Sequence, residues 1–582
     1  MPVEPHLNDE TQATDLHAEA VGGDAPIDPP DQRTGGHGWA IGLLFVILAL
    51  AFAYRAVAAL RFGLRFPPPL DDAYMFCRYA DHLLRGWGLA WNPDGVQTYG
   101  CTSLLYTFWI AGLRVVTDRA WPELLAIGSW IPGVLAVVVT GLACSRVGRV
   151  SLFRRRLAGI SFAMLCVVVQ GGYFFHLRSG MDTTTAMLLN ALLVFVVVHP
   201  RFPESLPRAC LAAGVAWLAF LARPDSLIYV VCFGLGVALL CRERGRRTVR
   251  GALVFAGALV VLLAIDAAVK HAVFGSALPL PFYAKSRGFY EGYVGAAQWN
   301  PYAFMRYFLF QNGVAVAVLL LAVGRRSWRL TLAVLVACLL TWGYYATVVQ
   351  IMGYRARFYY PFMPFLIVAA YRALDGRWPV MLAGGPRWRR EAVEGLLLTG
   401  IACGVFALFS TSGMMNWQTE SIRSADVGRQ RVANYRPESV ARHLGLTETV
   451  GALSGLMDSC APEAAWAMSE HGLLGAQHPL TPILDLVGLH DRATLTGESV
   501  VDHLFAERPD VIWFPHPAYR GMIAAMETRP EFRAEYDYWP GAFEYGIAVR
   551  RSSPCYLTLL GAMQQVWPEL YGRSMPAPAS PR

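Results

Sequence analysis

Residues 39–60 read WAIGLLFVILALAFAYRAVAAL, an apolar run interrupted by the single charged residue Arg55. About 20 mostly apolar residues suffice for a helix to cross the hydrocarbon core of a bilayer, so this run predicts a membrane-spanning helix. The whole chain of 582 residues shares the bias, with 55% hydrophobic and 16% charged residues. Soluble proteins carry about 25% charged residues. The composition therefore excludes a chain of several soluble domains and predicts a protein that crosses the membrane repeatedly.

Further apolar runs along the chain predict an α-helical polytopic membrane protein with about eleven transmembrane helices. Another apolar run, 104–116, is short and contains Arg114. Whether that run crosses the membrane decides the orientation of everything after it. The other predicted spans lie at 122–145, 157–175, 182–199, 209–222, 226–241, 251–272, 306–324, 330–351, 359–373 and 392–413.

Several connections between the predicted spans are rich in arginine. Cytoplasmic loops of membrane proteins carry an excess of Lys and Arg, so these connections are expected on the cytoplasmic side. They share that side only if 104–116 lies along the outer surface, as a juxtamembrane helix of the first outer loop, 61–121. The N-terminus is then cytoplasmic, and the C-terminal region lies outside the inner membrane. The arginine-rich connections are 146–156, 242–250, 325–329 and 372–390.

Polar regions flank the predicted spans at both ends of the chain. Residues 1–38 are acidic with one arginine, the opposite of the positive start of a signal peptide, and predict a disordered cytoplasmic tail. From residue 414 onward hydropathy falls, and DVIWF (510–514) and EYGIAVRR (544–551) have strand-like patterns. We therefore expect a transmembrane domain over 39–413 and a soluble extracytoplasmic cap domain, α/β or α+β, over 414–582.

The segment 67–103, PPPLDDAYMFCRYADHLLRGWGLAWNPDGVQTYGCTS, follows the first predicted span. Its prolines halt the chain, and Asp71 and Asp72 then begin a predicted helix that ends before Gly86 and Gly88. Either aspartate alone would serve as a helix N-cap. Two adjacent carboxylates repel one another, which raises the pKa of one toward the range of a general base. The pair is therefore a candidate catalytic group.

This segment resembles the first outer loop of the GT-C glycosyltransferases, polytopic enzymes that take sugars from polyprenyl-phosphate donors. Within that superfamily it is similar to the terminal β-arabinofuranosyltransferase branch of mycobacterial arabinan synthesis, whose loop has the pattern DDAY…RYA…G.GL.YN…TN. It departs at Met75-Phe76-Cys77, and Gln97 stands near the position of an expected glutamate. The matching residues are Asp71, Asp72, Ala73, Tyr74, Arg78, Tyr79, Ala80, Leu83, Gly86, Gly88, Leu89, Asn92, Tyr99, Gly100, Thr102, Ser103 and Leu104.

Further motifs of the same branch follow in the same order, so that the resemblance covers about residues 40–515. It implies a GT-C fold and transfer of a sugar, a pentofuranose such as arabinofuranose, to an extracytoplasmic glycan, lipid-linked glycan or protein. The motifs are SGMDTTTA (179–186), similar to SGMET; ARPDS (222–226), similar to RPEG; PLPFYAKS (279–286), similar to LPNTFYAK; RARFYYPFMP (355–364), similar to RFLVPALP; and LDLVGLHD (484–491), similar to IDLLGLTD.

The implied reaction explains why cations and carboxylates gather on the outer side. A lipid phosphate leaves with negative charge, which guanidinium and ammonium groups stabilise. The acceptor hydroxyl must lose a proton, for which Asp71 is our first choice of base and Asp72 the second. One base without a covalent intermediate implies inversion. The residues expected to bind donor phosphate or substrate are Tyr74, Arg78, Tyr79, Asn92, Thr102, Ser103, Arg178, Asp182, Arg223, Asp225, Tyr283, Lys285, Arg355 and Arg357.

Histidines and cysteines of the chain show no spacing typical of a metal site, so we expect neither a metal nor another cofactor. His176, His471 and His490 in particular form no such pattern. Two disulfides are possible outside the cytoplasm, Cys460 with Cys555 and Cys77 with Cys101. Asp266 and Lys270 are one helical turn apart and predict a structural ion pair.

Other functions remain open from the sequence. A hexosyl or aminoarabinosyl transferase of the same superfamily is the near alternative. A polytopic lipid or solute transporter is an alternative from another class, although transporters place polar sites near the bilayer midplane and often show inverted repeats. A sensor that binds glycan would leave Asp71 and Asp72 without a purpose. We expect a monomer in the bilayer, with a lipid-linked donor and a glycan, lipid or protein acceptor, and no nucleic-acid partner.

Overall fold

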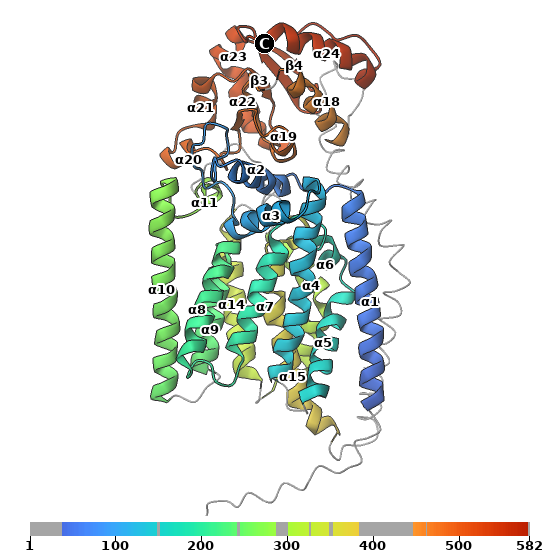
Figure 1. Cartoon of the computed structure of the whole chain (residues 1–582), viewed down its shortest axis with the longest axis vertical. Coiled ribbons are helices and arrows are strands. Elements are labelled where there is room, and N and C mark those ends of the chain that lie inside the picture. The colour runs from blue at the N-terminus through green and yellow to red at the C-terminus, as the bar shows by residue number, and fades with distance from the viewer. Residues whose placement is uncertain are drawn as a thin grey trace, which may run out of the picture.

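A computed structural model describes residues 38–147, 152–240, 245–286, 301–324, 327–348, 353–382, 446–460 and 462–579. A bundle of long helices forms one part of the molecule, and a smaller domain containing a β-sheet sits on one end of the bundle (Figure 1). Two short helices, α2 (Asp72–Leu84) and α3 (Leu104–Val116), lie crosswise between the two parts (Figure 1). The molecule therefore has a helical part, a layer formed by the first outer loop, and a soluble domain.

Small side chains allow the helices of the bundle to pack closely. In α8 the alanines at positions 209, 212, 213, 216 and 219 are all fully buried, and small residues at such spacing let helix backbones approach one another. The helices are α1 (Gly38–Arg65), α4 (Trp121–Val147), α5 (Leu152–Val168), α7 (Thr183–Val197), α8 (Leu206–Ala222), α9 (Ser226–Leu240), α10 (Arg246–Phe274), α12 (Pro301–Gln311), α13 (Gly313–Ala322), α14 (Trp328–Ala346) and α15 (Met363–Leu382).

Among the described residues, 4 helices are long and apolar enough to cross a membrane, in α1, α4, α10 and α14. Helices α12 and α13 together make a fifth candidate, bent by 79°. Shorter apolar helices, α5, α7, α8 and α9, fall in other predicted spans. The predicted span 392–413 lies outside the described residues. The mostly helical architecture with several apolar helices is thus confirmed, and the number of eleven spans stays a prediction.

The prediction of a helix after the aspartate pair is confirmed, since α2 runs from Asp72 to Leu84. Gly86 and Gly88 follow with φ of 84° and 72°, a left-handed conformation that glycine adopts without strain. Gln97 then closes the loop, because its Oε1 accepts from the Leu89 amide at 2.7 Å. Its Nε2 also donates to the Trp87 carbonyl at 2.7 Å. Gln97, which lies near the position where the resemblance leads us to expect a glutamate, therefore stabilises the fold of the loop.

The soluble domain contains a mixed five-stranded sheet in the order β2-β1-β3-β5-β4. Strands β2, β1 and β3 are parallel, and β5 and β4 are antiparallel to their neighbours. DVIWF and EYGIAVRR supply β3 and β5, so both predicted strands are confirmed. The strands are β1 (Trp466–Met468), β2 (Ile483–Asp485), β3 (Val511–Trp513), β4 (Tyr536–Pro540) and β5 (Gly546–Arg550).

Seven helices surround this sheet, and the short α19 lies on the side that faces α2 (Figure 1). Segments that follow the carboxyl ends of β1 and β2 carry the contacts with the first outer loop. Open α/β sheets bind their ligands beyond the carboxyl ends of their strands. That end of the sheet therefore faces the helical part. The helices are α18 (Leu446–Ser459), α19 (Gly472–Gln477), α20 (Ala493–Thr496), α21 (Val500–Glu507), α22 (Arg520–Thr528), α23 (Pro530–Glu535) and α24 (Tyr556–Tyr571).

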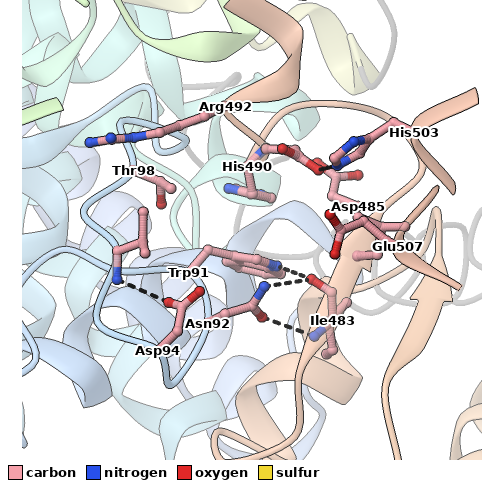
Figure 2. A pocket seen from close by; sticks show the side chains of 13 residues that line it. Trp91, Asn92, Asp94, Thr98, Ile483, Asp485, His490, Arg492, His503 and Glu507 are labelled. Carbon is pink, nitrogen blue, oxygen red and sulfur yellow. Dashed lines mark hydrogen bonds and ion pairs between the residues drawn. The ribbon is translucent and has the colours of Figure 1, made fainter. Parts of the chain in front are cut away.

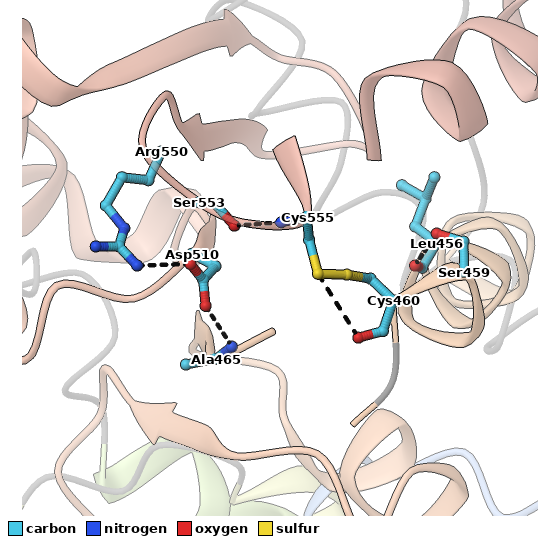
Figure 3. Close-up of a disulfide and its surroundings, with 8 residues drawn as sticks. All are labelled: Leu456, Ser459, Cys460, Ala465, Asp510, Arg550, Ser553 and Cys555. Atoms are coloured by element: carbon cyan, nitrogen blue, oxygen red, sulfur yellow. Dashed lines mark hydrogen bonds and ion pairs between the residues drawn. A yellow bond between two sulfur atoms is a disulfide. The ribbon is translucent and has the colours of Figure 1, made fainter. Parts of the chain in front are cut away.

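A disulfide joins Cys460, directly after α18, to Cys555, directly before α24 (Figure 3). Their Cα atoms are 6.1 Å apart, within the range that a disulfide spans. The bridge lies near the ion pair in which Arg550 Nη2 donates to Asp510 Oδ1 at 2.6 Å (Figure 3). Cys77 and Cys101 are buried free thiols. Of the two possible disulfides, the one in the soluble domain is present and the one in the outer loop is not.

Candidate functional site

The Asp71 carboxylate immediately precedes α2, yet it caps a different helix. Its Oδ2 accepts from the Gly472 amide at 2.7 Å, and its Oδ1 accepts from the Leu473 amide at 2.8 Å. It makes no side-chain cap bond to α2 itself. Burial raises the pKa of Asp71, although the charge of His471 and the two backbone hydrogen bonds oppose the shift. Both oxygens therefore hold the first turn of α19.

The neighbouring carboxylate, Asp72, points to the helical part of the molecule. Arg357 Nη2 donates to Asp72 Oδ2 at 2.9 Å, and the two side chains are 6% and 16% exposed. Among the described residues, the Nε and Nη1 groups of Arg357 are buried without a hydrogen-bond partner. A buried guanidinium donor without an acceptor is costly. Such donors are satisfied when an anionic ligand binds beside them.

Lys285 lies on the short helix α11 (Leu280–Ser286), close to the same ion pair. Its side chain is half-buried and forms no hydrogen bond within the part of the chain that the structure describes. Burial lowers the pKa of Lys285 to about 8, and the charge of Asp72 opposes that shift while the charge of Arg357 adds to it. An ammonium group and a guanidinium group thus share one charged environment with a carboxylate.

Glu470 brings a further carboxyl group to this place from the soluble domain. It follows β1 by two positions and is half-buried. Burial, together with the negative charges of Asp71 and Asp72, raises the pKa of Glu470 to about 8. No sequence motif singles out Glu470, and an acidic side chain just beyond a buried strand is the signal that could have identified it. We call Asp71, Asp72, Lys285, Arg357 and Glu470 the carboxylate–cation cluster.

A second ion-pair group is formed by residues of the SGMDTTTA and ARPDS motifs. Arg223 Nε and Nη2 donate to Asp225 at 3.1 and 2.6 Å, and Arg223 Nη1 lies 3.3 Å from Asp182 Oδ1. The Tyr345 hydroxyl donates to Asp225 Oδ2 at 2.8 Å. Asp182 Oδ2 is buried without a partner among the described residues. Arg223 is thus largely satisfied by carboxylates, in contrast to Arg357.

The remaining predicted cations lie at the same end of the bundle. The Arg178 guanidinium lies over the Phe62 ring at 4.0 Å. Arg355 has a φ of 53°, and its Nη1 donates to the Tyr307 hydroxyl at 3.2 Å. The Arg355 carbonyl lies 3.1 Å from His176 Nε2. A non-glycine residue in the left-handed region costs about 1–2 kcal/mol, so the packing around this segment imposes its shape.

Arg78 holds the soluble domain to the first outer loop. It is fully buried, and its Nη1 donates to the Gly475 and His478 carbonyls at 2.9 and 3.0 Å. Its Nη2 donates to the Thr481 carbonyl at 2.8 Å and to Asn92 Oδ1 at 3.3 Å, and its Nε donates to the Trp91 carbonyl at 2.6 Å. Every N–H of the guanidinium has an acceptor within the protein. Arg78 therefore docks the two parts and has no donor left for a substrate.

Other predicted substrate-binding residues of the loop also meet protein partners. Asn92 pairs with the backbone of Ile483 in β2, accepting from its amide at 2.9 Å and donating to its carbonyl at 3.2 Å. The Tyr79 hydroxyl is 3.0 Å from His490 Nδ1. Ser103 caps α3 by accepting from the Tyr106 amide. Tyr74 donates to the Pro68 carbonyl, whereas Thr102 and Tyr283 are half-buried.

Three side chains of the soluble domain, His471, Asp485 and His490, have ligand-type atoms within 4.8 Å of one another. The sequence showed no such spacing, because His471 follows β1 whereas Asp485 ends β2 and His490 lies beyond it. His471 Nε2 lies 2.8 Å from Asp485 Oδ1, and Asp485 also accepts from the amides of Val487, Leu489 and His490. Although burial opposes both shifts, mutual attraction raises the pKa of His471 and lowers that of Asp485 to about 2. The geometry fits a buried ion pair, because backbone amides already occupy the carboxylate.

A pocket of about 200 Å³ lies at the seam between the first outer loop and the soluble domain (Figure 2). Trp91 and Asn92 approach Ile483 from the loop side, and Trp91 Nε1 donates to the Ile483 carbonyl at 3.0 Å (Figure 2). His490 stacks on Trp91 with ring centroids 3.9 Å apart. The pocket is separate from the carboxylate–cation cluster, since none of the cluster residues lines it. The lining residues are Trp91, Asn92, Asp94, Val96, Thr98, Ile483, Leu484, Asp485, His490, Asp491, Arg492, His503 and Glu507.

Comparison with known proteins finds distant structural likenesses. No protein-family model and no curated protein matches the sequence. ArnT from Cupriavidus metallidurans bound to undecaprenyl phosphate is similar with 12% identity and a TM-score of 0.49, over 89% of this chain and 99% of that one. The archaeal oligosaccharyltransferase AglB from Archaeoglobus fulgidus, in complex with an inhibitory peptide and a dolichol-phosphate, is similar with 12% identity and a TM-score of 0.45, over 91% and 78%. Similarity at this level leaves the function to be judged from the residues of the chain.

Proposed function

We propose that this chain is a membrane glycosyltransferase that moves a sugar from a polyprenyl-phosphate donor to an acceptor hydroxyl outside the cytoplasm. The observation that carries the proposal is the buried guanidinium of Arg357. It has two groups without a hydrogen-bond partner among the described residues, it pairs with the Asp72 carboxylate, and its charge acts on the Lys285 ammonium. An anionic leaving group and a proton acceptor are the two requirements of such a transfer, and this place supplies both.

Arg357 and Lys285 bind the donor phosphate in this proposal. A guanidinium and an ammonium stabilise the charge that develops as the bond between the anomeric carbon and the phosphate oxygen breaks. The lipid phosphate leaves as an anion and remains paired with both cations. Arg223 is already engaged by Asp182 and Asp225, so we assign it to the shape of the site rather than to the phosphate.

The base is a carboxylate of the vicinal aspartate pair. Both oxygens of Asp71 accept backbone amides of α19, whereas Asp72 has Arg357 Nη2 as its hydrogen-bond donor. The sequence favoured Asp71, and the hydrogen bonds favour Asp72 as the group that takes the acceptor's proton. The acceptor oxygen attacks the anomeric carbon from the side opposite the phosphate, and the configuration inverts. Asp71 then positions α19 over the site.

The resemblance of segment 67–103 to the arabinofuranosyltransferase branch supports a pentofuranose, such as arabinofuranose, as the transferred sugar. Arginine-rich connections between the spans support an orientation in the inner membrane with a cytoplasmic N-terminus. The soluble domain then lies outside the cytoplasm, where a disulfide such as Cys460–Cys555 persists. A hexosyl or aminoarabinosyl donor is the alternative within the same chemistry.

Transfer from radiolabelled polyprenyl-phospho-sugars by the purified chain tests the proposal. We expect Asp72→Asn to lower turnover by about 10²–10⁴-fold without weakening donor binding, because the amide keeps the shape and removes the proton acceptor. Asp81→Asn is the matched control, since Asp81 lies on the same helix and pairs with the exposed Arg85. A panel of pentofuranosyl, hexosyl and aminoarabinosyl donors identifies the sugar.

Full activity of both Asp71→Asn and Asp72→Asn would overturn the base assignment. Absence of transfer from every donor in the panel, together with movement of lipid or solute across proteoliposomes, would favour the transporter. If Asp71→Asn is inactive although its soluble domain remains docked, and Asp72→Asn is active, then Asp71 rather than Asp72 is the base.

A further inference from the structure

We propose that Glu470, supplied by the soluble domain, is a third carboxyl group of the reaction site and shares the acceptor's proton with Asp72. The inference rests on the proposed function and deepens it, because it makes the soluble domain part of the catalytic site. Nothing in the sequence motifs of the first outer loop assigns a role to this residue.

The position of Glu470 follows from how the soluble domain docks. It lies two positions beyond β1, which is flanked by parallel strands on both sides. Segments that follow the carboxyl ends of such strands commonly form ligand sites. The amides of Gly472 and Leu473, two and three residues further along the chain, donate to the Asp71 carboxylate at 2.7 and 2.8 Å. Docking therefore fixes Glu470 beside the aspartate pair.

The electrostatics of Glu470 fit a shared proton. In the part of the chain that the structure describes, its carboxyl group has no hydrogen bond and no ion pair. Asp71 and Asp72 face it with like charge, and their repulsion together with burial raises the pKa of Glu470 to about 8. Burial raises the pKa of Tyr354, a residue of the helical part, and the charges of Glu470 and Asp72 add to that shift. A carboxyl group held beside like charges in this way keeps its proton to a higher pH, and once ionised it can take up a proton again near neutral pH.

A structural role alone accounts poorly for these features. A carboxylate kept for stability is expected to meet a cation or backbone amides, as Asp485 meets His471 and three amides. Glu470 instead remains half-buried with negative neighbours, an arrangement that costs stability. Such costs are typical of groups retained for chemistry.

The proton then moves in a balanced step. The acceptor hydroxyl gives its proton to the ionised Asp72–Glu470 pair as its oxygen bonds to the anomeric carbon. The bond from that carbon to the phosphate oxygen breaks, and the polyprenyl phosphate leaves with the electron pair. Glu470 spreads the accepted proton over two carboxyl groups, and water takes it away before the next turnover. No metal or other co-reactant is required.

The test compares wild type, Glu470→Gln and the control Glu463→Gln, an exposed position of the same domain. We expect Glu470→Gln to lower kcat by about 10²-fold while donor binding and the melting temperature of the soluble domain are retained. The rising limb of the pH–rate profile should also move to lower pH. The raised pKa of Glu470 then no longer sets the pH at which the site becomes able to accept a proton. Glu463→Gln should match wild type in rate and in pH profile.

Infrared difference titration of the substrate-free protein gives a readout that does not depend on sugar transfer. We expect a protonated carboxyl band that disappears near pH 8 in wild type and is missing in Glu470→Gln. If no donor supports transfer but the band behaves as expected, the proposed glycosyltransferase function is refuted, whereas the proton-binding role of Glu470 is supported. An unshifted pH–rate limb, or a band that Glu470→Gln leaves in place, would overturn the inference even in an active enzyme.

Discussion

Asp71 Oδ2 accepts a hydrogen bond of 2.7 Å from the amide of Gly472, a residue 401 positions later in the chain. The first outer loop and the soluble domain therefore meet at the most distinctive motif of the sequence. The same carboxylate also accepts a hydrogen bond from the Leu473 amide. It therefore caps the free N-terminal amides of α19, although it belongs to a distant part of the chain. The motif that carries the resemblance to glycosyltransferases thus also carries the docking of the soluble domain.

Replacement of Gly472 tests this contact directly. A Cβ atom at this position would lie 2.0 Å from the Asp71 carbonyl oxygen, so Gly472→Ala must push α19 away from the loop. We expect a loss of about 1–3 kcal/mol of stability, as for other overpacked sites. Thermal unfolding of the purified protein measures it. Gly455→Ala in α18 is the control, because its Cβ meets nothing within 4 Å and should leave stability equal or higher. Equal melting of both variants would refute the close contact.

Arg357 offers a test of donor binding. Arg357→Lys keeps the charge but loses the forked donors, of which Nε and Nη1 lack partners among the described residues. Loss of one or two hydrogen bonds to a charged ligand should weaken the affinity for polyprenyl phosphate by about 10–100-fold. Calorimetric titration with a short-chain polyprenyl phosphate measures this. Arg329→Lys, at an exposed position beside Trp328, should bind as wild type. Unchanged affinity in Arg357→Lys would remove Arg357 from the donor site.

The disulfide predicts a defined effect of reduction. It closes a loop of 95 positions between Cys460 and Cys555, and removing a native disulfide from a small extracytoplasmic domain costs about 2–5 kcal/mol. Cys460→Ser with Cys555→Ser should therefore lower the melting temperature of the soluble domain, as should a reductant. Wild type with reductant and the double variant should melt alike. Mass spectrometry of unreduced peptides should find this pair bridged and Cys77 and Cys101 free.

Buried titratable groups make stability depend on pH. Folding raises the pKa of His471 above 6.5 and that of Glu470 from 4.5 to about 8. In each case the folded state binds the proton more tightly than the unfolded state, so stability is full at low pH and falls as pH rises through the folded pKa. Asp485, with a pKa of about 2, stays ionised throughout.

Thermal unfolding between about pH 6 and pH 8 should therefore show a falling melting temperature. His471→Gln and Glu470→Gln should each make the melting temperature fall less steeply with pH. Each variant removes one group that binds its proton more tightly in the folded state than in the unfolded state. Glu463→Gln, at an exposed position, should leave the slope unchanged. A melting temperature that rises over this interval in wild type would contradict the assigned shifts.

Apolar runs and alternating patterns were sufficient for most of the architecture, since the described apolar runs are helical and the two strand-like runs became β3 and β5. The run 306–324 became two helices, α12 and α13, with a bend of 79° between them. It could place Asp72 and Arg357 at the same end of the bundle but could not pair them across 285 positions. It also could not decide which aspartate faces the cations. That choice depends on the side to which each carboxylate turns at the start of α2, which only tertiary packing determines.

Residues of the soluble domain were the least predictable part of the site. Glu470 belongs to no motif, and His471, Asp485 and His490 meet only because β1 and β2 lie side by side. Arg78 illustrates the opposite case, because its place in a recognised motif suggested a ligand for substrate. Its five donors are used by backbone and amide acceptors of both parts. Such a role depends on contacts about 400 residues away in the chain, beyond any local pattern.

All five strands lie between Cys460 and Cys555. A protease that cuts any one peptide bond within that interval would release no fragment, because the two pieces stay covalently joined through sulfur. The nicked sheet keeps its neighbours at high effective concentration, so its strands re-pair faster than they diffuse apart. The bridge thus protects the domain that carries Glu470 against accidental cleavage.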